Sequence, residues 1–286
     1  MKEPFRICVV GGGTMGNGIA HVFAQKGFPV TLVEAKKELG DKALATIAKN
    51  MERQVAKGTL SAADKDAALG RLTCAVSIAD AAGFDFAVEA VPEKLEIKTA
   101  VFKELAKHGA PGAILATNTS SLPITDIAAS VANPERVIGM HFMNPVPVMK
   151  LVEIIRGKKT SDEVTAATKA LTDKLGKIPA VANDFPGFVS NRVLMPMINE
   201  AILCLQEGVS TKEDIDTIMK LGMAHPMGPI ALADYIGLDV CLAIMEVLDK
   251  GFGGTKYKPA TLLREMVASG KLGVKTGAGF YEYKPK

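Results

Sequence analysis

The first 183 residues alternate short apolar runs with segments of helical periodicity. The runs have the length and the β-branched content of buried strands, and they are Ile7–Val10, Val30–Val33, Phe86–Glu89, Ala113–Ala116 and Val137–Phe142. Between them, Met15–Lys26 and Ala43–Ala56 repeat apolar residues at the spacing of a helix face. This alternation predicts an α/β fold with a doubly wound, mostly parallel sheet of the Rossmann type.

The pattern changes near Asp184, after which the segments are helical and strand-like runs end. The helical segments are Phe188–Gln206, Lys212–Met219, Gly237–Leu248 and Pro259–Ala268. The stretch Asn183–Gly187 holds a Pro-Gly pair, which is typical of a boundary. We therefore predict two domains, an α/β domain over residues 1–183 and an all-helical domain over residues 184–286.

Composition narrows the class of protein. The net charge of the 286 residues is +3, which is too small to indicate nucleic-acid binding. The cysteines are scattered without a Cys-x-x-Cys pair, so we expect neither a metal site nor a disulfide framework. No apolar stretch is long enough to cross a bilayer, and Met1–Pro4 leads directly into the first strand without a signal segment. We expect a cytoplasmic protein.

A glycine-rich loop joins the first strand to the first helix. Its residues are Gly11, Gly12, Gly13, Thr14, Met15 and Gly16, which match Gly-x-Gly-x-x-Gly. The motif alone is weak, but here it follows a strand, opens a helix and precedes a second strand, as dinucleotide binding requires. The helix N-terminus would then supply N–H groups and partial positive charge to the pyrophosphate. The alternative is a structural glycine turn.

Glu34 ends the second strand, about 20 residues after the loop. A carboxylate at this position accepts hydrogen bonds from the adenine ribose hydroxyls and repels a 2′-phosphate, so we expect NAD rather than NADP. Lys36 and Lys37 could shield such a phosphate, although a solvated helix start is the simpler explanation for them.

A histidine and a glutamate stand at equal distances from a predicted turn. His141 lies in the strand Val137–Phe142, Glu153 lies in the strand-like run Val148–Ile155, and the midpoint between them falls at residue 147. If the two strands fold back on each other, Glu153 faces His141. Such a pair suits alcohol oxidation, because histidine accepts the hydroxyl proton and the carboxylate fixes its tautomer. From spacing alone, a core histidine beside an unrelated glutamate fits equally well.

Two further polar sites stand out. Asn118–Ser121 follows the strand Ala113–Ala116, at the sheet edge where α/β proteins bind ligands. One of its side chains should cap the helix expected near Pro123–Ser130, while another could contact substrate. Asn191 begins a helical apolar stripe, which continues through Leu194, Ile198, Ala201 and Leu205. A buried amide needs a partner, and either a backbone group or a ligand could supply it.

Together these residues resemble the 3-hydroxyacyl-CoA dehydrogenase family nearly end to end. Besides the glycine loop, the resemblance is carried by Asn118–Leu122, Gly139–Pro145, Met149–Glu153, Pro186–Arg192, His225–Pro229 and Lys275–Tyr281. It implies NAD-dependent interconversion of a short-chain 3-hydroxyacyl-CoA, such as 3-hydroxybutyryl-CoA, with its 3-ketoacyl-CoA. It also implies a helical domain that forms a homodimer.

The resemblance assigns roles to matching residues. His141 would be the general acid/base, paired with Glu153, while Ser120 and Asn191 would hold the substrate oxygens and the nicotinamide region. The other positions that would contact NAD are Glu93, Lys98, Asn144 and Lys275. Lys57 would contact a CoA phosphate, although a solvated helix face is the simpler explanation for it.

Two alternatives stay open at this point. Hydroxy-acid dehydrogenases, such as gulonate dehydrogenase and its lambda-crystallin relatives, resemble the chain in the glycine loop and the histidine motif. A non-catalytic NAD-binding or structural protein could also keep the fold. The family often has Asp at position 34, where this chain has the longer Glu34, which carries the same charge.

Overall fold

The structure is a computed structural model and describes residues 5–284. The chain divides into two compact units, Met1–Asp184 and Phe185–Lys286. Each unit has its own hydrophobic core. No helix in the described range is both long and apolar enough to cross a membrane.

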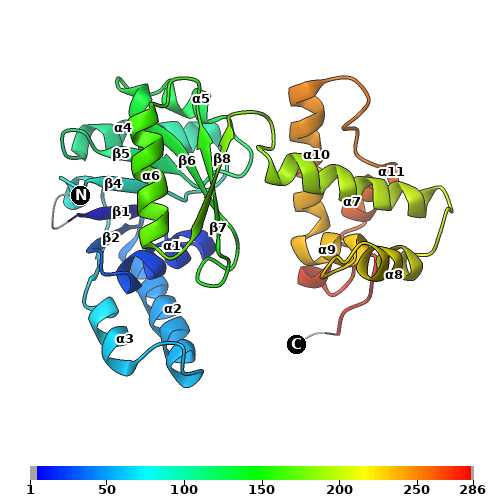
Figure 1. The fold of residues 1–286 in the computed structure, drawn as a ribbon, viewed down its shortest axis with the longest axis horizontal. Helices are drawn as coiled ribbons and strands as arrows, with labels where there is room; N and C mark the ends of the chain where they lie inside the picture. Colours follow the sequence, from blue (N-terminus) through cyan, green and yellow to red (C-terminus); the bar gives the residue numbers. More distant parts are fainter. Residues whose placement is uncertain (1–4, 285–286) are drawn as a thin grey trace. The chain divides into compact units, whose positions relative to one another are not determined.

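The first unit is built on an eight-stranded sheet in the order β3-β2-β1-β4-β5-β6-β7-β8 (Figure 1). The strands are β1 Ile7–Val10, β2 Val30–Val33, β3 Leu72–Ala75, β4 Phe86–Glu89, β5 Ile114–Thr117, β6 Val137–Phe142, β7 Leu151–Arg156 and β8 Ile178–Asn183. Only the β6–β7 pair is antiparallel among the neighbouring strands of this sheet. The predicted mostly parallel, doubly wound sheet is therefore confirmed.

Helices connect the strands and pack on the sheet (Figure 1). They are α1 Thr14–Gln25, α2 Lys37–Ala56, α3 Ala62–Leu69, α4 Leu95–His108, α5 Ile124–Ala128 and α6 Asp162–Lys174. The chain runs from β1 outward to β3 and then returns to the other side of β1 at β4. This reversal creates a switch point beyond the carboxyl ends of β1 and β4, where open α/β sheets bind ligands.

The sequence did not reveal two of the strands, β3 and β8, which form the two edges of the sheet. An edge strand has a neighbour on one side only, so its residues need not form a continuous apolar run. In β8, Ile178 and Val181 are exposed and Pro179 interrupts the pattern, which is tolerated at an edge. At the centre of the sheet the apolar runs are fully buried, and Cys8 is a small core residue as expected.

The second unit contains five helices in its described part: α7 Ser190–Gln206, α8 Lys212–Gly222, α9 Pro229–Ile236, α10 Leu238–Phe252 and α11 Thr261–Ala268. The stripe predicted on α7 faces the core, because Ile198 and Ala201 are buried while Leu194 and Leu205 pack against that core. After α11 the chain runs back to α9, which carries Asp234. There the buried carboxylate of Asp234 accepts hydrogen bonds from the backbone N–H groups of Phe280 and Tyr281.

Candidate active site

The glycine loop lies at the switch point of the sheet. Gly11 has a φ of 97°, and a Cβ on it would come within 2.7 Å of the Ala90 carbonyl oxygen that follows β4. A Cβ on Gly16 would collide with the Gly11 carbonyl oxygen. Glycine is therefore required at both positions, one for the turn and one for the close approach of α1 to the loop.

The start of α1 can accept a phosphate group. Gly13 is the N-cap residue, no side chain caps the helix there, and its first turn has no acidic residue. A Cβ on Gly13 would point into open space, with nothing within 4 Å. The N-terminal N–H groups and the helix dipole therefore face room for an anion, which is the arrangement that the pyrophosphate of a dinucleotide needs.

Glu34 lies against the same loop. Its Oε1 accepts a hydrogen bond from the Gly12 N–H at 2.6 Å, and its Oε2 accepts one from the Ala35 N–H at 3.1 Å. The carboxylate therefore stands at the position expected for ribose recognition. Lys37 begins α2 and pairs with Asp41 one turn later, with both side chains exposed, as in the solvated helix start considered above.

Glu93 organises the loop that follows β5. Its Oε1 accepts hydrogen bonds from Thr119 Oγ1 at 2.6 Å, from the Ser120 N–H at 2.9 Å and from the Ser121 N–H at 3.1 Å. Its Oε2 lies 3.2 Å from Lys98 Nζ. Burial alone would raise the pKa of Glu93, but Lys98 and the donors from Thr119 and Ser120 outweigh it and lower the pKa. Three of the predicted cofactor residues, Glu93, Lys98 and Ser120, are thus brought together.

The same loop is tied to the strand that carries the predicted acid/base. Asn118 Oδ1 accepts a hydrogen bond from the backbone N–H of Phe142 at 2.8 Å. The link joins the carboxyl end of β5 to that of β6, one residue beyond His141. Asn118 therefore has a structural role here, while Ser120 lies on the loop whose amides contact Glu93.

One sequence-based expectation for this loop is wrong. No side chain of Asn118–Ser121 caps the following helix, because the N–H groups of Ile124 and Thr125 donate to the carboxylate of Asp184 at 3.1 and 2.8 Å. Thr119 instead accepts from the Leu122 N–H within its own loop, at 3.0 Å. The cap comes from a residue 60 positions away, which local spacing could not reveal.

His141 and Glu153 face each other, as the spacing predicted. They are register partners in the antiparallel pair of β6 and β7. His141 Nδ1 lies 3.1 Å from Glu153 Oε2, and both side chains are buried. An ionised carboxylate only accepts hydrogen bonds, so it favours the tautomer with the proton on Nδ1. The Nε2 atom then carries the lone pair and is able to accept a proton.

The turn between β6 and β7 is held by a buried lysine. Lys177 Nζ donates to the carbonyl oxygens of Val146 and Met149 at 2.6 and 2.7 Å. Burial, and to a smaller extent Lys26, lowers the pKa of Lys177. This turn also carries Asn144, whose side chain is exposed at the surface of the first unit.

The remaining predicted residues lie elsewhere. Asn191 is a buried residue in the first turn of α7, and Lys275 forms an ion pair with Asp239, both in the second unit. Burial alone would raise the pKa of Asp239, but the hydrogen bond from Lys275 and its positive charge outweigh this effect and lower the pKa. Lys57 follows the end of α2 in the first unit and is exposed.

Sequence reasoning missed Glu89, which is fully buried at the end of β4. Its Oε1 lies 2.7 Å from Lys98 Nζ, and burial raises its pKa although Lys98 opposes the rise. The signal was present in the sequence, since Glu89 is an acidic residue at the end of an apolar run of β4. Such a residue needs a buried partner.

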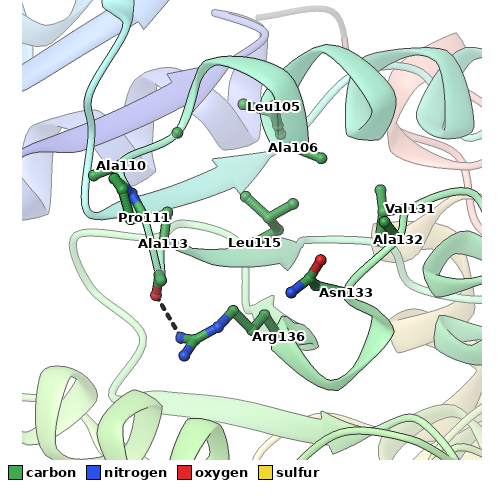
Figure 2. A pocket seen from close by; sticks show the side chains of 12 residues that line it. Leu105, Ala106, Ala110, Pro111, Ala113, Leu115, Val131, Ala132, Asn133 and Arg136 are labelled. Carbon is green, nitrogen blue, oxygen red and sulfur yellow. Dashed lines mark hydrogen bonds between the residues drawn. The ribbon is translucent and has the colours of Figure 1, made fainter.

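A hollow lies near the amino ends of β5 and β6, lined by residues of α4, of β5 and of the segments that precede β5 and β6 (Figure 2). It has a volume of about 300 Å³, and Arg136 beside it donates to the Gly112 carbonyl oxygen at 2.5 Å. It contains none of the predicted site residues. The carboxyl edge of the sheet therefore remains the candidate active site.

Two family models match the chain. The model described as the NAD binding domain of 3-hydroxyacyl-CoA dehydrogenase matches residues 6–185. The model described as the C-terminal domain of 3-hydroxyacyl-CoA dehydrogenase matches residues 187–283. The glycine loop, Glu34 and the His141–Glu153 pair all lie within the first match, whereas Asn191 and Lys275 lie within the second.

Individual proteins match over nearly the whole chain. A probable 3-hydroxybutyryl-CoA dehydrogenase of Bacillus subtilis is 52% identical over 281 residues, covering 98% of each chain. A probable 3-hydroxybutyryl-CoA dehydrogenase of Deinococcus radiodurans is 54% identical, covering 96% of this chain and 99% of the relative. The crystal structure of (S)-3-hydroxybutyryl-CoA dehydrogenase from Ralstonia eutropha is 48% identical with a TM-score of 0.96, covering 99% of this chain and 100% of the other.

Proposed function

This chain belongs to the 3-hydroxyacyl-CoA dehydrogenase family, and on that premise we propose that its substrate pair is 3-hydroxybutyryl-CoA and acetoacetyl-CoA. It is an NAD-dependent oxidoreductase of that family. The observation that carries the proposed chemistry is the buried pair of His141 and Glu153, at 3.1 Å. The choice of a four-carbon acyl chain is supported by the names of relatives that share about half of its residues.

The chemistry requires one proton and one hydride to leave the 3-hydroxyacyl group. Bound NAD supplies the hydride acceptor. His141 takes the hydroxyl proton on Nε2, while Glu153 keeps Nδ1 protonated and stabilises the imidazolium that results. In the direction of reduction, the imidazolium of His141 returns that proton to the oxygen of the 3-keto group. The alcohol would thus become a ketone with the release of one proton, and bound NAD would serve as the two-electron acceptor.

The residues proposed to hold the cofactor lie in both units. Gly11–Gly16 would receive the pyrophosphate, and Glu34 the adenine ribose. The further cofactor residues that we propose are Glu93, Lys98, Ser120, Asn144 and Lys275. The open space at Gly13 and the uncapped start of α1 support the first of these assignments.

The residues proposed to hold the substrate are Ser120, Asn191 and Lys57. Ser120 and Asn191 would hold the oxygens of the acyl group in the geometry needed for hydride transfer. Lys57 would contact a phosphate of CoA, and its exposure at the end of α2 suits an ion pair with a ligand. A solvated position would explain the same exposure.

The experiment is the oxidation of NADH with acetoacetyl-CoA, repeated with free acetoacetate and with NADPH. We expect turnover with NADH and the CoA ester, and at least about tenfold lower kcat/KM when either is replaced. Faster turnover of free acetoacetate would indicate a hydroxy-acid dehydrogenase. Binding of NADH without turnover of either compound would mean that the proposed substrate is wrong.

We also propose a homodimer formed through the helical unit and a cytoplasmic location. Support for the dimer comes from Val193, Ile218 and Leu221, which expose apolar side chains on α7 and α8. Light scattering after gel filtration measures the mass, and a monomer at micromolar concentration would contradict the dimer. Fractionation of the source cells tests the location.

A further inference from the structure

Glu89 has no place in the function proposed so far, yet it is the most completely buried acidic residue near the site. Its exposed fraction is 0%, and that of its partner Lys98 is 1%. In the sheet it is flanked by Val10 on β1 and Thr117 on β5. Removing a carboxylate and an ammonium group from water costs free energy, and an apolar pair of similar volume could fill the same space at lower cost. Their presence here therefore calls for a reason other than packing.

Both oxygens of Glu89 are engaged. Oε1 accepts hydrogen bonds from Lys98 Nζ and from the Val91 N–H, each at 2.7 Å. Oε2 accepts a hydrogen bond from Thr117 Oγ1, also at 2.7 Å. One carboxylate thus joins the end of β4, the first turn of α4 and the end of β5.

The two arms of this network converge on the same loop. Through the first, Lys98 Nζ reaches Glu93 Oε2 at 3.2 Å. Glu93 in turn accepts from the Ser120 N–H. Through the second, Thr117 Oγ1 accepts from the Thr119 N–H at 3.1 Å. Glu89 is therefore linked to the Thr119–Ser120 backbone by two routes. One passes through Lys98 and Glu93, and the other passes through Thr117.

We propose that Glu89 is a positioning residue for cofactor binding, acting through Lys98 and Thr117 on Glu93 and the Ser120 loop. The inference rests on the proposed roles of Glu93 and Ser120 at the NAD site. It assigns Glu89 no contact with cofactor or substrate. The charge of Glu89 balances that of Lys98, so Glu93 is not the sole carboxylate that neutralises Lys98. The carboxylate of Glu93 can then accept hydrogen bonds from the amide groups of the loop.

Glu89→Gln tests this proposal, because the amide keeps the size of the side chain but removes its charge. Lys98 then has Glu93 as its one remaining anionic partner, which draws Glu93 away from the Ser120 N–H. We expect the KM for NADH and the dissociation constant of NADH to rise about tenfold, as for the loss of a hydrogen bond to a charged group. Partial unfolding would lower the apparent kcat, because it lowers the amount of active enzyme, but would leave KM unchanged.

The matched control is Asp85→Asn, the same change of acid to amide immediately before β4. Asp85 Oδ2 accepts a hydrogen bond from the Arg6 N–H at an exposed position. We expect the KM for NADH to stay within about twofold of wild type in this variant. A KM for NADH in Glu89→Gln that equals the wild-type value would overturn the proposal.

A second variant covers the case in which Glu89→Gln does not fold. Thr117→Val keeps the volume of the side chain but removes the hydroxyl that joins Glu89 to the Thr119 N–H. It should raise the dissociation constant of NADH in the same direction, and an unchanged constant would overturn the proposal.

The binding measurement separates this proposal from the proposed function. The chain contains no tryptophan, so the fluorescence of bound NADH can be followed without a tryptophan signal. If the wild type binds NADH but does not reduce acetoacetyl-CoA, the proposed substrate is wrong. The effect of Glu89→Gln on NADH binding then still decides the role of Glu89.

Discussion

His141 and Glu153 are twelve residues apart in the chain and stand directly opposite each other on β6 and β7, with Nδ1 3.1 Å from Oε2. The antiparallel pair is what makes this possible, because the rest of the sheet is parallel and would bring no short hairpin to the site. Burial of both side chains strengthens the interaction between them. Most of the testable chemistry depends on this pair.

Replacing His141 by Gln should lower kcat for acetoacetyl-CoA reduction by about 10²–10⁴-fold, the usual contribution of general acid/base catalysis. The KM for NADH should change little, because His141 is proposed to act on the substrate oxygen. Steady-state kinetics measure both values. His108→Gln, on α4 and partly exposed, is the control. Retention of more than about a tenth of kcat would rule out His141 as the acid/base.

Replacing Glu153 by Gln should lower kcat within the same range, because the amide neither fixes the Nδ1–H tautomer nor stabilises the imidazolium. If the two residues act as one unit, the double variant His141→Gln/Glu153→Gln should be no slower than His141→Gln alone. The exposed Glu163→Gln on α6 is the control. Multiplicative losses in the double variant would show that Glu153 acts independently of His141.

Replacing Glu34 by Gln should weaken the preference for NADH over NADPH. The variant loses the negative charge that repels a 2′-phosphate and a charge-assisted hydrogen bond from the Gly12 N–H. We expect kcat/KM for NADH to fall about tenfold, while that for NADPH rises or holds. Kinetics with both cofactors measure the ratio, with exposed Glu38→Gln on α2 as the control. An unchanged ratio would mean that Glu34 does not determine the choice of cofactor.

Stability should fall on acidification, in part because of His21. This residue on α1 is fully buried, its Nε2 lies 3.3 Å from Gln54 Oε1, and its Nδ1 has no hydrogen-bond partner. Burial lowers the pKa of His21 below 6.5, although the hydrogen bonds with Gln54 and Gln25 oppose this. The unfolded chain therefore binds a proton that the folded protein does not, so stability decreases as the pH falls through 6.5.

The variant His21→Leu removes this proton uptake on unfolding. Its Tm should vary less between pH 5 and pH 7.5 than the Tm of the wild type. This interval extends about one pH unit or more on either side of the ordinary pKa of histidine. Scanning calorimetry in matched buffers measures the difference. His225→Leu, at a partly exposed position in the second unit, is the control. If the Tm of His21→Leu depends on pH as steeply as the Tm of the wild type, other groups account for the loss of stability in acid.

Several features of the site followed from local spacing. The glycine loop, the strand before it and the acidic residue at the end of β2 lie within 28 consecutive positions, so their arrangement depends on one strand–helix–strand unit. The register of His141 with Glu153 also follows from a short connection, because side chains in a strand repeat every two residues. Such relationships can be derived before the fold is known.

Other features depended on contacts between distant residues. The cap of α5 comes from Asp184, the turn after β6 is held by Lys177, and Glu89 is bonded to Thr117 28 residues away. No periodicity connects these residues, and their pairing requires the whole sheet to be assembled. The edge strands β3 and β8 could not be predicted for a related reason: most of their residues are exposed or only partly buried, so they form no continuous apolar run.

The sequence by itself therefore determined the class of fold, the glycine loop and the histidine–glutamate pair, because each is encoded by residues close together in the chain. Only the tertiary structure decided which buried polar groups support them. A charge that is withdrawn from water is stabilised by whichever partner the fold brings within hydrogen-bond distance. For the buried Glu89 and the partly buried Asp184, that partner is set by the order of strands in the sheet rather than by their neighbours in sequence.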